Sequence, residues 1–157
     1  MAKYPTKFYE DIHVGDEHTT ETYFLGMEEV LEFAGKYDPQ PMHTDPEKAK
    51  DTIFGELVAS GWNVLAITMR LMAKSNPLGE TPLIGMHLSE SRFHTRIHAD
   101  TNLIVKAVVK DKRMSSSSAK RGYVNMFLET FDADKDVLLV SQNWEIIVPV
   151  RHEIKPM

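Results

Sequence analysis

The stretch Ser60-Gly-Trp-Asn-Val-Leu-Ala-Ile-Thr-Met-Arg-Leu-Met-Ala73 decides how this chain folds. Serine is a favoured N-cap residue, so Ser60 predicts the start of a helix. From residue 61 to 73 apolar side chains occupy nearly every face of that helix. A helix without a polar face must be covered by other structure. At about 1.5 Å per residue it is roughly 20 Å long, a length that a curled sheet can wrap.

The sequence after this helix changes to a β-type pattern. Four segments show partial alternation of apolar and polar residues: 83–93, 102–110, 122–132 and 137–150. The serine-rich stretch 113–120 is a predicted long turn, and the acidic stretch 132–136 is a predicted hairpin loop. One buried helix inside a curled antiparallel sheet is the economical way to pack these elements, so the predicted class is α+β.

The sequence before the helix predicts smaller elements. Apolar residues recur at helical spacing over 27–34, and Gly35 stands where a C-terminal cap belongs. Two prolines in the stretch 37–43 predict a stiff, non-helical segment that carries polar side chains. Asp45 precedes a proline and is predicted to cap a short helix. A short strand is expected over 19–23.

The composition limits the classes of protein and function to which this chain can belong. The 157 residues carry 18 basic and 23 acidic side chains, a net charge of −5, and no cysteine. Without cysteine there is no disulfide and no thiolate nucleophile or metal ligand. No basic tract marks a nucleic-acid or anionic membrane surface. We therefore expect a single domain over 1–157, cytoplasmic, with no nucleic-acid or membrane partner.

Asp38 and His43 are the candidate chemical pair. A carboxylate and an imidazole five residues apart can act as base and acid near neutral pH. The structural alternative is that Asp38 stabilises a turn and His43 packs in the core. A metal site on His43 and Asp45 is a further alternative, but no third ligand is evident, so no metal is predicted.

The sequences of two neighbouring stretches resemble those of a known family. These are Phe33-Ala-Gly-Lys-Tyr-Asp-Pro-Gln-Pro-Met-His-Thr-Asp-Pro-Glu-Lys-Ala49 and Phe54-Gly-Glu-Leu-Val-Ala-Ser-Gly61. They resemble the MaoC-like dehydratases, which include the (R)-specific enoyl-CoA hydratases and have the hotdog fold. The matching positions are Asp38, Pro41, His43, Asp45, Ala49, Phe54-Gly55 and Ser60-Gly61.

The resemblance implies a reaction and a set of roles. The chain would add water to, or remove it from, the double bond of an enoyl-CoA, with Asp38 and His43 activating water. The backbone N–H of Gly61, at the positive end of the helix dipole, would donate to the enolate oxygen. Tight packing of helix against sheet is the alternative reason for Gly61. The predicted substrate-binding residues are Gln40, Ser60, Trp62 and Met69.

The resemblance also implies an assembly and a ligand. Family members form homodimers or larger symmetric assemblies through their sheet edges. Coenzyme A would enter as part of the acyl-CoA substrate, with no other cofactor. Stricter hydratases carry Gly, Asn and Ser at the positions of Tyr37, Gln40 and Met69. Met69 cannot donate a hydrogen bond, so hydroxyl support for the active-site water is either lost or supplied by Thr68.

Two other functions and two further groups of residues remain open. A hotdog thioesterase would direct water at the thioester carbonyl, and a non-catalytic module would only bind acyl-CoA. His94 and His98 are predicted surface histidines. Basic residues around the serine-rich turn are predicted to lie in solvent, with contact to coenzyme A phosphates as the alternative. They are Lys110, Lys112, Arg113, Lys120 and Arg121.

Overall fold

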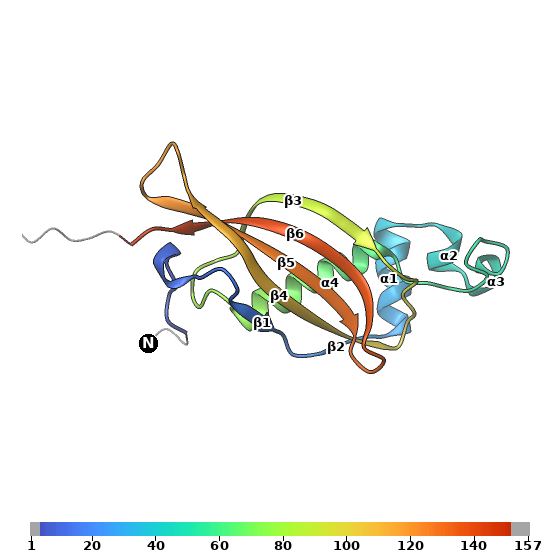
Figure 1. The fold of residues 1–157 in the computed structure, drawn as a ribbon. Coiled ribbons are helices and arrows are strands. Elements are labelled where there is room, and N and C mark those ends of the chain that lie inside the picture. Colours follow the sequence, from blue (N-terminus) through green and yellow to red (C-terminus); the bar gives the residue numbers. More distant parts are fainter. Residues whose placement is uncertain (1–3, 152–157) are drawn as a thin grey trace, which may run out of the picture.

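A bent antiparallel sheet packs along one long helix in the computed structural model, which describes residues 4–151 (Figure 1). This arrangement confirms the predicted α+β class. In chain order the elements are a 3-10 helix (Tyr9–Asp11), β1 (Glu17–Thr19), β2 (Tyr23–Leu25), α1 (Met27–Tyr37), α2 (Pro41–Thr44), α3 (Pro46–Ala49), α4 (Gly61–Ser75), β3 (Ile84–Phe93), β4 (Thr101–Met114), β5 (Arg121–Asp132) and β6 (Val137–Pro149).

The sheet has the strand order β1-β4-β5-β6-β3, and β2 also pairs with β4. All pairings are antiparallel, and β4, β5 and β6 form a meander of two long hairpins. The four strands predicted after the helix are confirmed. The single strand expected over 19–23 is wrong, because β1 and β2 pair separately with β4. Between them Thr20 exchanges hydrogen bonds with the backbone of Val105.

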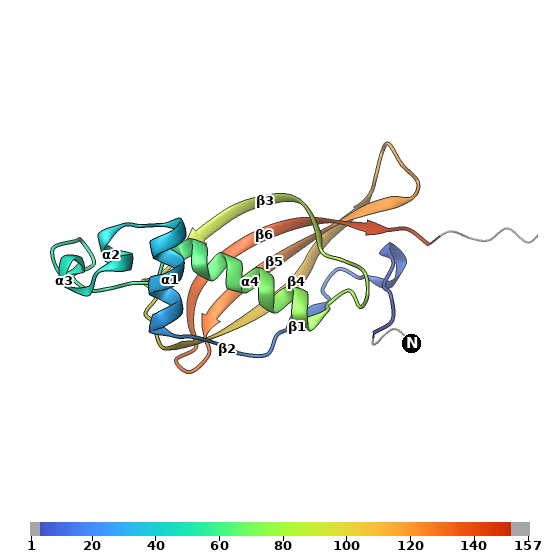
Figure 2. The same ribbon diagram turned by 180° about the vertical axis from the view of Figure 1, so that it is seen from behind.

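The predicted central helix is α4, which runs along the concave side of the sheet (Figure 2). Ser60 caps it as predicted, since its Oγ accepts a hydrogen bond from the Trp62 N–H at 3.3 Å. The helix ends at Ser75, and the next residue, Asn76, has the left-handed backbone typical of a C-terminal stop. Its inner face packs on the sheet through Val64, Ile67, Thr68, Leu71 and Met72.

The outer face of α4 is not covered. Trp62 is 66% exposed and Met69 is 41% exposed, although both are large apolar side chains. The prediction that this helix is surrounded is therefore wrong for the single chain. Burying such side chains is favourable in proportion to their apolar area, so this face is suited to contact with another molecule.

Helices α1, α2 and α3 gather at the N-terminal end of α4 (Figure 2). Gly35 lies inside α1, which continues to Tyr37, so the predicted cap at Gly35 is wrong. The stretch expected to be non-helical contains α2, because Pro41 takes its first position, where no N–H is needed. The predicted cap at Asp45 is confirmed, since its carboxylate accepts from two backbone N–H groups of α3.

Among residues 4–151 no helix is both long and apolar enough to cross a membrane.

Candidate active site

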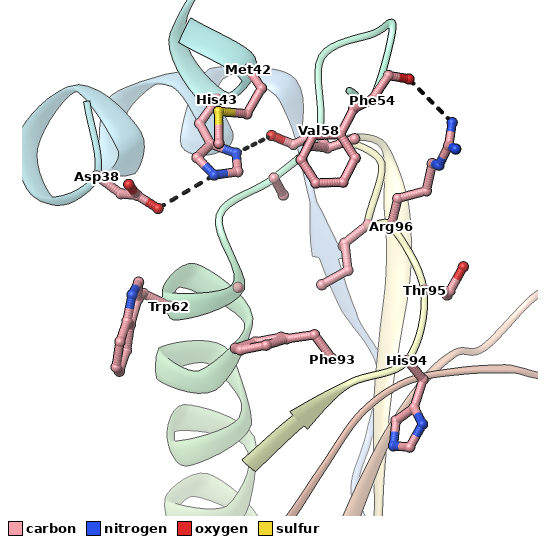
Figure 3. Close-up of a pocket in the computed structure, with 13 residues that line it drawn as sticks. Asp38, Met42, His43, Phe54, Val58, Trp62, Phe93, His94, Thr95 and Arg96 are labelled. Carbon is pink, nitrogen blue, oxygen red and sulfur yellow. Dashed lines mark hydrogen bonds and ion pairs between the residues drawn. The ribbon is translucent and has the colours of Figure 1, made fainter. Parts of the chain in front are cut away.

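A cavity of about 460 Å³ opens beside the N-terminus of α4 (Figure 3). Asp38 and His43 face it from the ends of α1 and α2. Most of the remaining wall is apolar: Met42, Phe54, Val58, Trp62, Phe93 and Ile97. A cavity with apolar walls and a few converging polar groups is the usual form of a small-molecule site.

Asp38 is held in place by two side-chain donors. The Ser60 hydroxyl donates to Asp38 Oδ2 at 2.7 Å, and the Gln40 amide donates to Oδ1 at 2.6 Å. Burial alone would raise the pKa of the Asp38 carboxyl. The hydrogen bonds from Ser60 and Gln40, with the positive charge that His43 can carry, outweigh burial and hold that pKa below its usual range. Asp38 is therefore ionised at neutral pH.

His43 is buried, and a backbone carbonyl fixes which ring nitrogen carries the proton. Its Nδ1 lies 2.8 Å from the carbonyl oxygen of Val58. A carbonyl only accepts hydrogen bonds, so Nδ1 is the protonated nitrogen and donates to it. In the neutral ring the lone pair is then on Nε2, which lies 3.4 Å from Asp38 Oδ2.

The pair therefore presents two acceptors to the same space. An ionised carboxylate oxygen and a neutral Nε2 both accept hydrogen bonds, and a water molecule can donate one hydrogen to each. A water held in this way is oriented by Asp38 and can pass a proton to His43. The structure thus brings together the two residues that the sequence singled out, in a geometry suited to activating water.

Gly61 contributes backbone to the cavity. As the first residue of α4, its N–H has no acceptor within the helix. A Cβ built on Gly61 would overlap the ring of Phe93 at the end of β3. The missing side chain therefore leaves room for close approach to the backbone, and the Phe93 ring occupies that room in this structure. This geometry fits both the predicted oxyanion contact and the alternative of tight packing.

The other predicted substrate-binding residues fall in three places. Gln40 and Ser60 hydrogen-bond to Asp38, and Trp62 lines the cavity. Met69 lies two turns further along the exposed face of α4 and is not part of the cavity wall. Contact with substrate stays a prediction for all four.

The hydroxyl of Thr68 does not serve the cavity. Thr68 is fully buried, and its Oγ1 donates to the Val64 carbonyl at 2.9 Å and pairs with Thr130 Oγ1 at 2.7 Å. It therefore points to the sheet rather than to Asp38 and His43, and the alternative that it supports the active-site water is wrong.

The metal alternative gains no support. The carboxylate of Asp45 accepts from the backbone N–H groups of Glu47 and Lys48 and so caps α3. Within the described part of the chain no cluster of three or more histidine, aspartate or glutamate residues could hold a metal ion.

Sequence reasoning missed the segment that follows β3. His94 is exposed, as predicted for a surface histidine, yet it also lines the cavity and pairs with Ser141 at 2.7 Å. Arg96 lines the cavity too, and His98 pairs with Glu56 at 3.0 Å. No local spacing reveals these residues, because only the bend of the sheet brings the end of β3 to the helix terminus.

The basic residues around the β4–β5 turn lie far from this cavity. Arg113, Lys120 and Arg121 flank that turn, which projects at the opposite end of the sheet from α1 and α2 (Figures 1 and 2). All three are exposed, as predicted, and their contact with coenzyme A phosphates stays an untested alternative.

Comparison with known proteins gives consistent matches. The family model described as a MaoC like domain matches residues 8–126. The uncharacterised protein YdeM of Bacillus subtilis strain 168 is 25% identical over 139 residues, covering 88% of this chain and 96% of YdeM. The family match spans all the cavity residues and strands β1 to β4.

Solved structures share the architecture. A MaoC-like dehydratase from Rhodospirillum rubrum matches with a TM-score of 0.86 and 31% identity, covering 93% of this chain and 99% of the other. The R-hydratase PhaJ1 from Pseudomonas aeruginosa matches with a TM-score of 0.72 and 23% identity, covering 97% and 96%. This likeness confirms the predicted hotdog architecture.

Proposed function

Because the chain belongs to the MaoC-like dehydratase family, we propose that it adds water to, or removes water from, the α,β double bond of an enoyl-CoA. One observation carries the proposal: Asp38 Oδ2 and His43 Nε2 face each other at 3.4 Å on the cavity wall, both as acceptors. Such a pair suits the activation of a water molecule next to an apolar acyl group.

The residues divide the chemistry of hydration between them. Water donates hydrogens to Asp38 and His43, and its oxygen attacks the β-carbon as His43 Nε2 takes the proton. The double-bond electrons move toward the thioester oxygen, where the N–H of Gly61 and the positive end of the α4 dipole stabilise the negative charge. His43 then returns the proton to the α-carbon, so the net change is addition of one water.

Asp38 does more than orient the water in this scheme. Its carboxylate lies beside the imidazolium that forms when His43 takes a proton, and opposite charges at that distance stabilise each other. The hydrogen bonds from Ser60 and Gln40 keep Asp38 ionised, so it does not compete for the same proton. Dehydration follows the same path in reverse, because both directions pass through the same transition states.

The substrate supplies the only coenzyme in this proposal. The apolar wall of the cavity suits an acyl chain, and coenzyme A enters as part of the thioester, with no resident cofactor or metal. We expect the acyl group to lie along Trp62 and toward Met69, whose side chains are exposed on the outer face of α4.

A homodimer would cover the apolar surface that the single chain leaves open. Strand β3 is an edge strand with exposed apolar side chains at Ile84, Met86 and Leu88, each at least half exposed. An unpaired apolar edge invites pairing with another chain. Two-fold pairing of β3 with its copy would also bring the outer faces of the two α4 helices together.

A direct test follows one substrate with two readouts. Purified protein is incubated with a short trans-2-enoyl-CoA, while the absorbance of the conjugated thioester and the release of free thiol are recorded together. Loss of absorbance without thiol is the expected result. Release of thiol would instead indicate a thioesterase, and binding of saturated and unsaturated acyl-CoA without reaction would indicate a binding module.

A further inference from the structure

A cluster of three charged or titratable side chains lies at the rim of the cavity. Glu56 Oε1 accepts from Arg96 at 2.9 Å and pairs with His98 at 3.0 Å. The same guanidinium nitrogen of Arg96 also donates to the carbonyl of Phe54 at 3.3 Å. We call Glu56, Arg96 and His98 the rim cluster. It ties the loop before α4 to the segment after β3.

The loop that the rim cluster holds is the one that orients His43. Two residues after Glu56, the Val58 carbonyl accepts the hydrogen bond from His43 Nδ1 at 2.8 Å. The next residue, Ala59, donates its N–H to the Ile97 carbonyl at 2.7 Å. The strip that supports His43 is therefore pinned to the segment after β3 at two points, one by side chains and one by backbone.

Backbone bonds hold only the end of this loop, where the Val58 N–H donates to the Met42 carbonyl at 2.9 Å and the Ala59 N–H donates to the Ile97 carbonyl. The chain before Val58 runs through Gly55, which has a left-handed backbone, and through Ile53, which is 95% exposed. Exposed loops with few buried contacts open readily. Side chains hold this stretch beside the cavity, since Arg96 donates to the Phe54 carbonyl and to Glu56, and His98 pairs with Glu56.

We propose that Glu56 is a positioning residue, which acts through the rim cluster and the Val58 carbonyl to hold His43 in its working tautomer and place. The proposed reaction needs the His43 proton on Nδ1, so that Nε2 can accept a hydrogen bond from water. If the Val58 carbonyl moves away, Nδ1 loses its acceptor, the ring is free to carry its proton on Nε2, and that nitrogen no longer accepts from water. A displacement of about 1 Å in a catalytic group costs about 10²-fold in rate.

The rim cluster can be removed without unfolding the chain. Glu56, Arg96 and His98 are all close to half exposed, and ion pairs between exposed side chains contribute little to stability. The loss of cluster contacts should therefore appear in the state of His43 rather than in the melting temperature.

Three variants test the proposal. Glu56→Ala removes the carboxylate that accepts from Arg96, and Glu56→Gln keeps an oxygen that can accept from it. The matched control is Glu47→Gln, which breaks an exposed ion pair between Glu47 on α3 and Lys50. Two-dimensional ¹H–¹⁵N NMR of the imidazole groups reports whether His43 carries its proton on Nδ1. Enoyl-CoA hydration kinetics, which rest on the proposed function, report kcat and KM separately.

We expect the variants to differ in kcat and in the NMR signal of the His43 Nδ1 proton. In Glu56→Ala, kcat falls about 10- to 100-fold with KM changed less than about 3-fold. The Nδ1 proton signal of His43 weakens or moves, and Glu56→Gln recovers part of both effects. Glu47→Gln matches the parent protein in both. An unchanged His43 signal in a folded Glu56→Ala protein would overturn the proposal. That outcome does not depend on the substrate, so it is distinguishable from failure of the hydratase proposal.

Discussion

The hydroxyl of Ser60 joins the two halves of the candidate site, and its removal has separable effects. Ser60 Oγ accepts from the Trp62 N–H as the cap of α4 and donates to Asp38 Oδ2 at 2.7 Å. Ser60→Ala removes both contacts. Ser60→Gly removes the same hydroxyl but keeps a residue that is well tolerated at a helix N-cap. The pair of variants therefore separates the cap from the bond to Asp38.

The magnitudes follow from the two contacts. Losing a cap to alanine costs about 1 kcal/mol, whereas glycine costs only a few tenths. A hydrogen bond to a charged group contributes about 1.5–3 kcal/mol, and the lower end applies because Asp38 keeps its bond from Gln40. At neutral pH we expect the free energy of unfolding to fall by about 2.5 kcal/mol in Ser60→Ala and by about 1.8 kcal/mol in Ser60→Gly.

The bond to Asp38 also has a pH signature. The pKa of Asp38 lies below its usual value of 3.8 in the folded chain, so its ionised form stabilises the fold. That stabilisation is present above the usual value and is lost as the pH falls through the lowered pKa. Removing the hydroxyl raises the pKa of Asp38 and so moves this loss to higher pH.

Urea unfolding at neutral pH and ¹³C NMR titration of the Asp38 carboxyl measure the two effects. Both variants should show a raised pKa for Asp38, and Ser60→Ala should be less stable than Ser60→Gly. If the pKa of Asp38 is the same in the parent protein and in Ser60→Gly, the assigned hydrogen bond is wrong.

Three further perturbations probe the core, the helix terminus and the open surface. Thr68→Val leaves Thr130 Oγ1 unpaired and should lower the unfolding free energy by about 1–2 kcal/mol, and adding Thr130→Val should recover most of it. An additive loss in urea unfolding would contradict this. Gly61→Ala should displace the exposed Phe93 ring, change stability by less than about 1 kcal/mol and lower enoyl-CoA hydration about 100-fold. The added Cβ would block approach to the backbone N–H, which alanine retains, so unaltered kcat would show that the reaction does not need an unobstructed backbone at position 61. Met86→Lys should turn a dimer into a monomer in sedimentation velocity, and a parent protein that is already monomeric would contradict the proposed assembly.

Local signals predicted much of the fold. The caps at Ser60 and Asp45 are read from single residues next to helical patterns, and alternation located the four long strands. The cap predicted at Gly35 is wrong because the low helix propensity of glycine has a smaller effect than the contacts between neighbouring side chains. The rings of Phe33 and Tyr37 lie 5.0 Å apart, one turn from each other, and α1 continues past the glycine to join them.

The covering of α4 could not be predicted from this pattern. An apolar helix face indicates that other structure packs against it, but it does not indicate whether that structure belongs to the same chain. Trp62 and Met69 show the difference, because both are exposed in the single chain.

The candidate site also contains residues that the sequence could predict and residues that it could not. Asp38 and His43 are five residues apart, and the local fold from the end of α1 into α2, which contains His43, is enough to bring their side chains together. The Val58 carbonyl, the Phe93 ring and the rim cluster come from distant segments or from backbone, where residue type carries no signal. Their role depends on how the end of β3 meets the start of α4, which is a tertiary feature.

The most direct test of the central claim, that Asp38 and His43 jointly activate water, is the rate of enoyl-CoA hydration in Asp38→Asn and His43→Ala beside the parent protein. Removing a group that transfers or steers a proton typically costs about 10²–10⁴ in rate, so each variant should lose at least about 100-fold in kcat/KM. Both variants should still unfold cooperatively, which shows that the loss is chemical. A folded His43→Ala protein that hydrates the substrate at the parent rate would contradict the account.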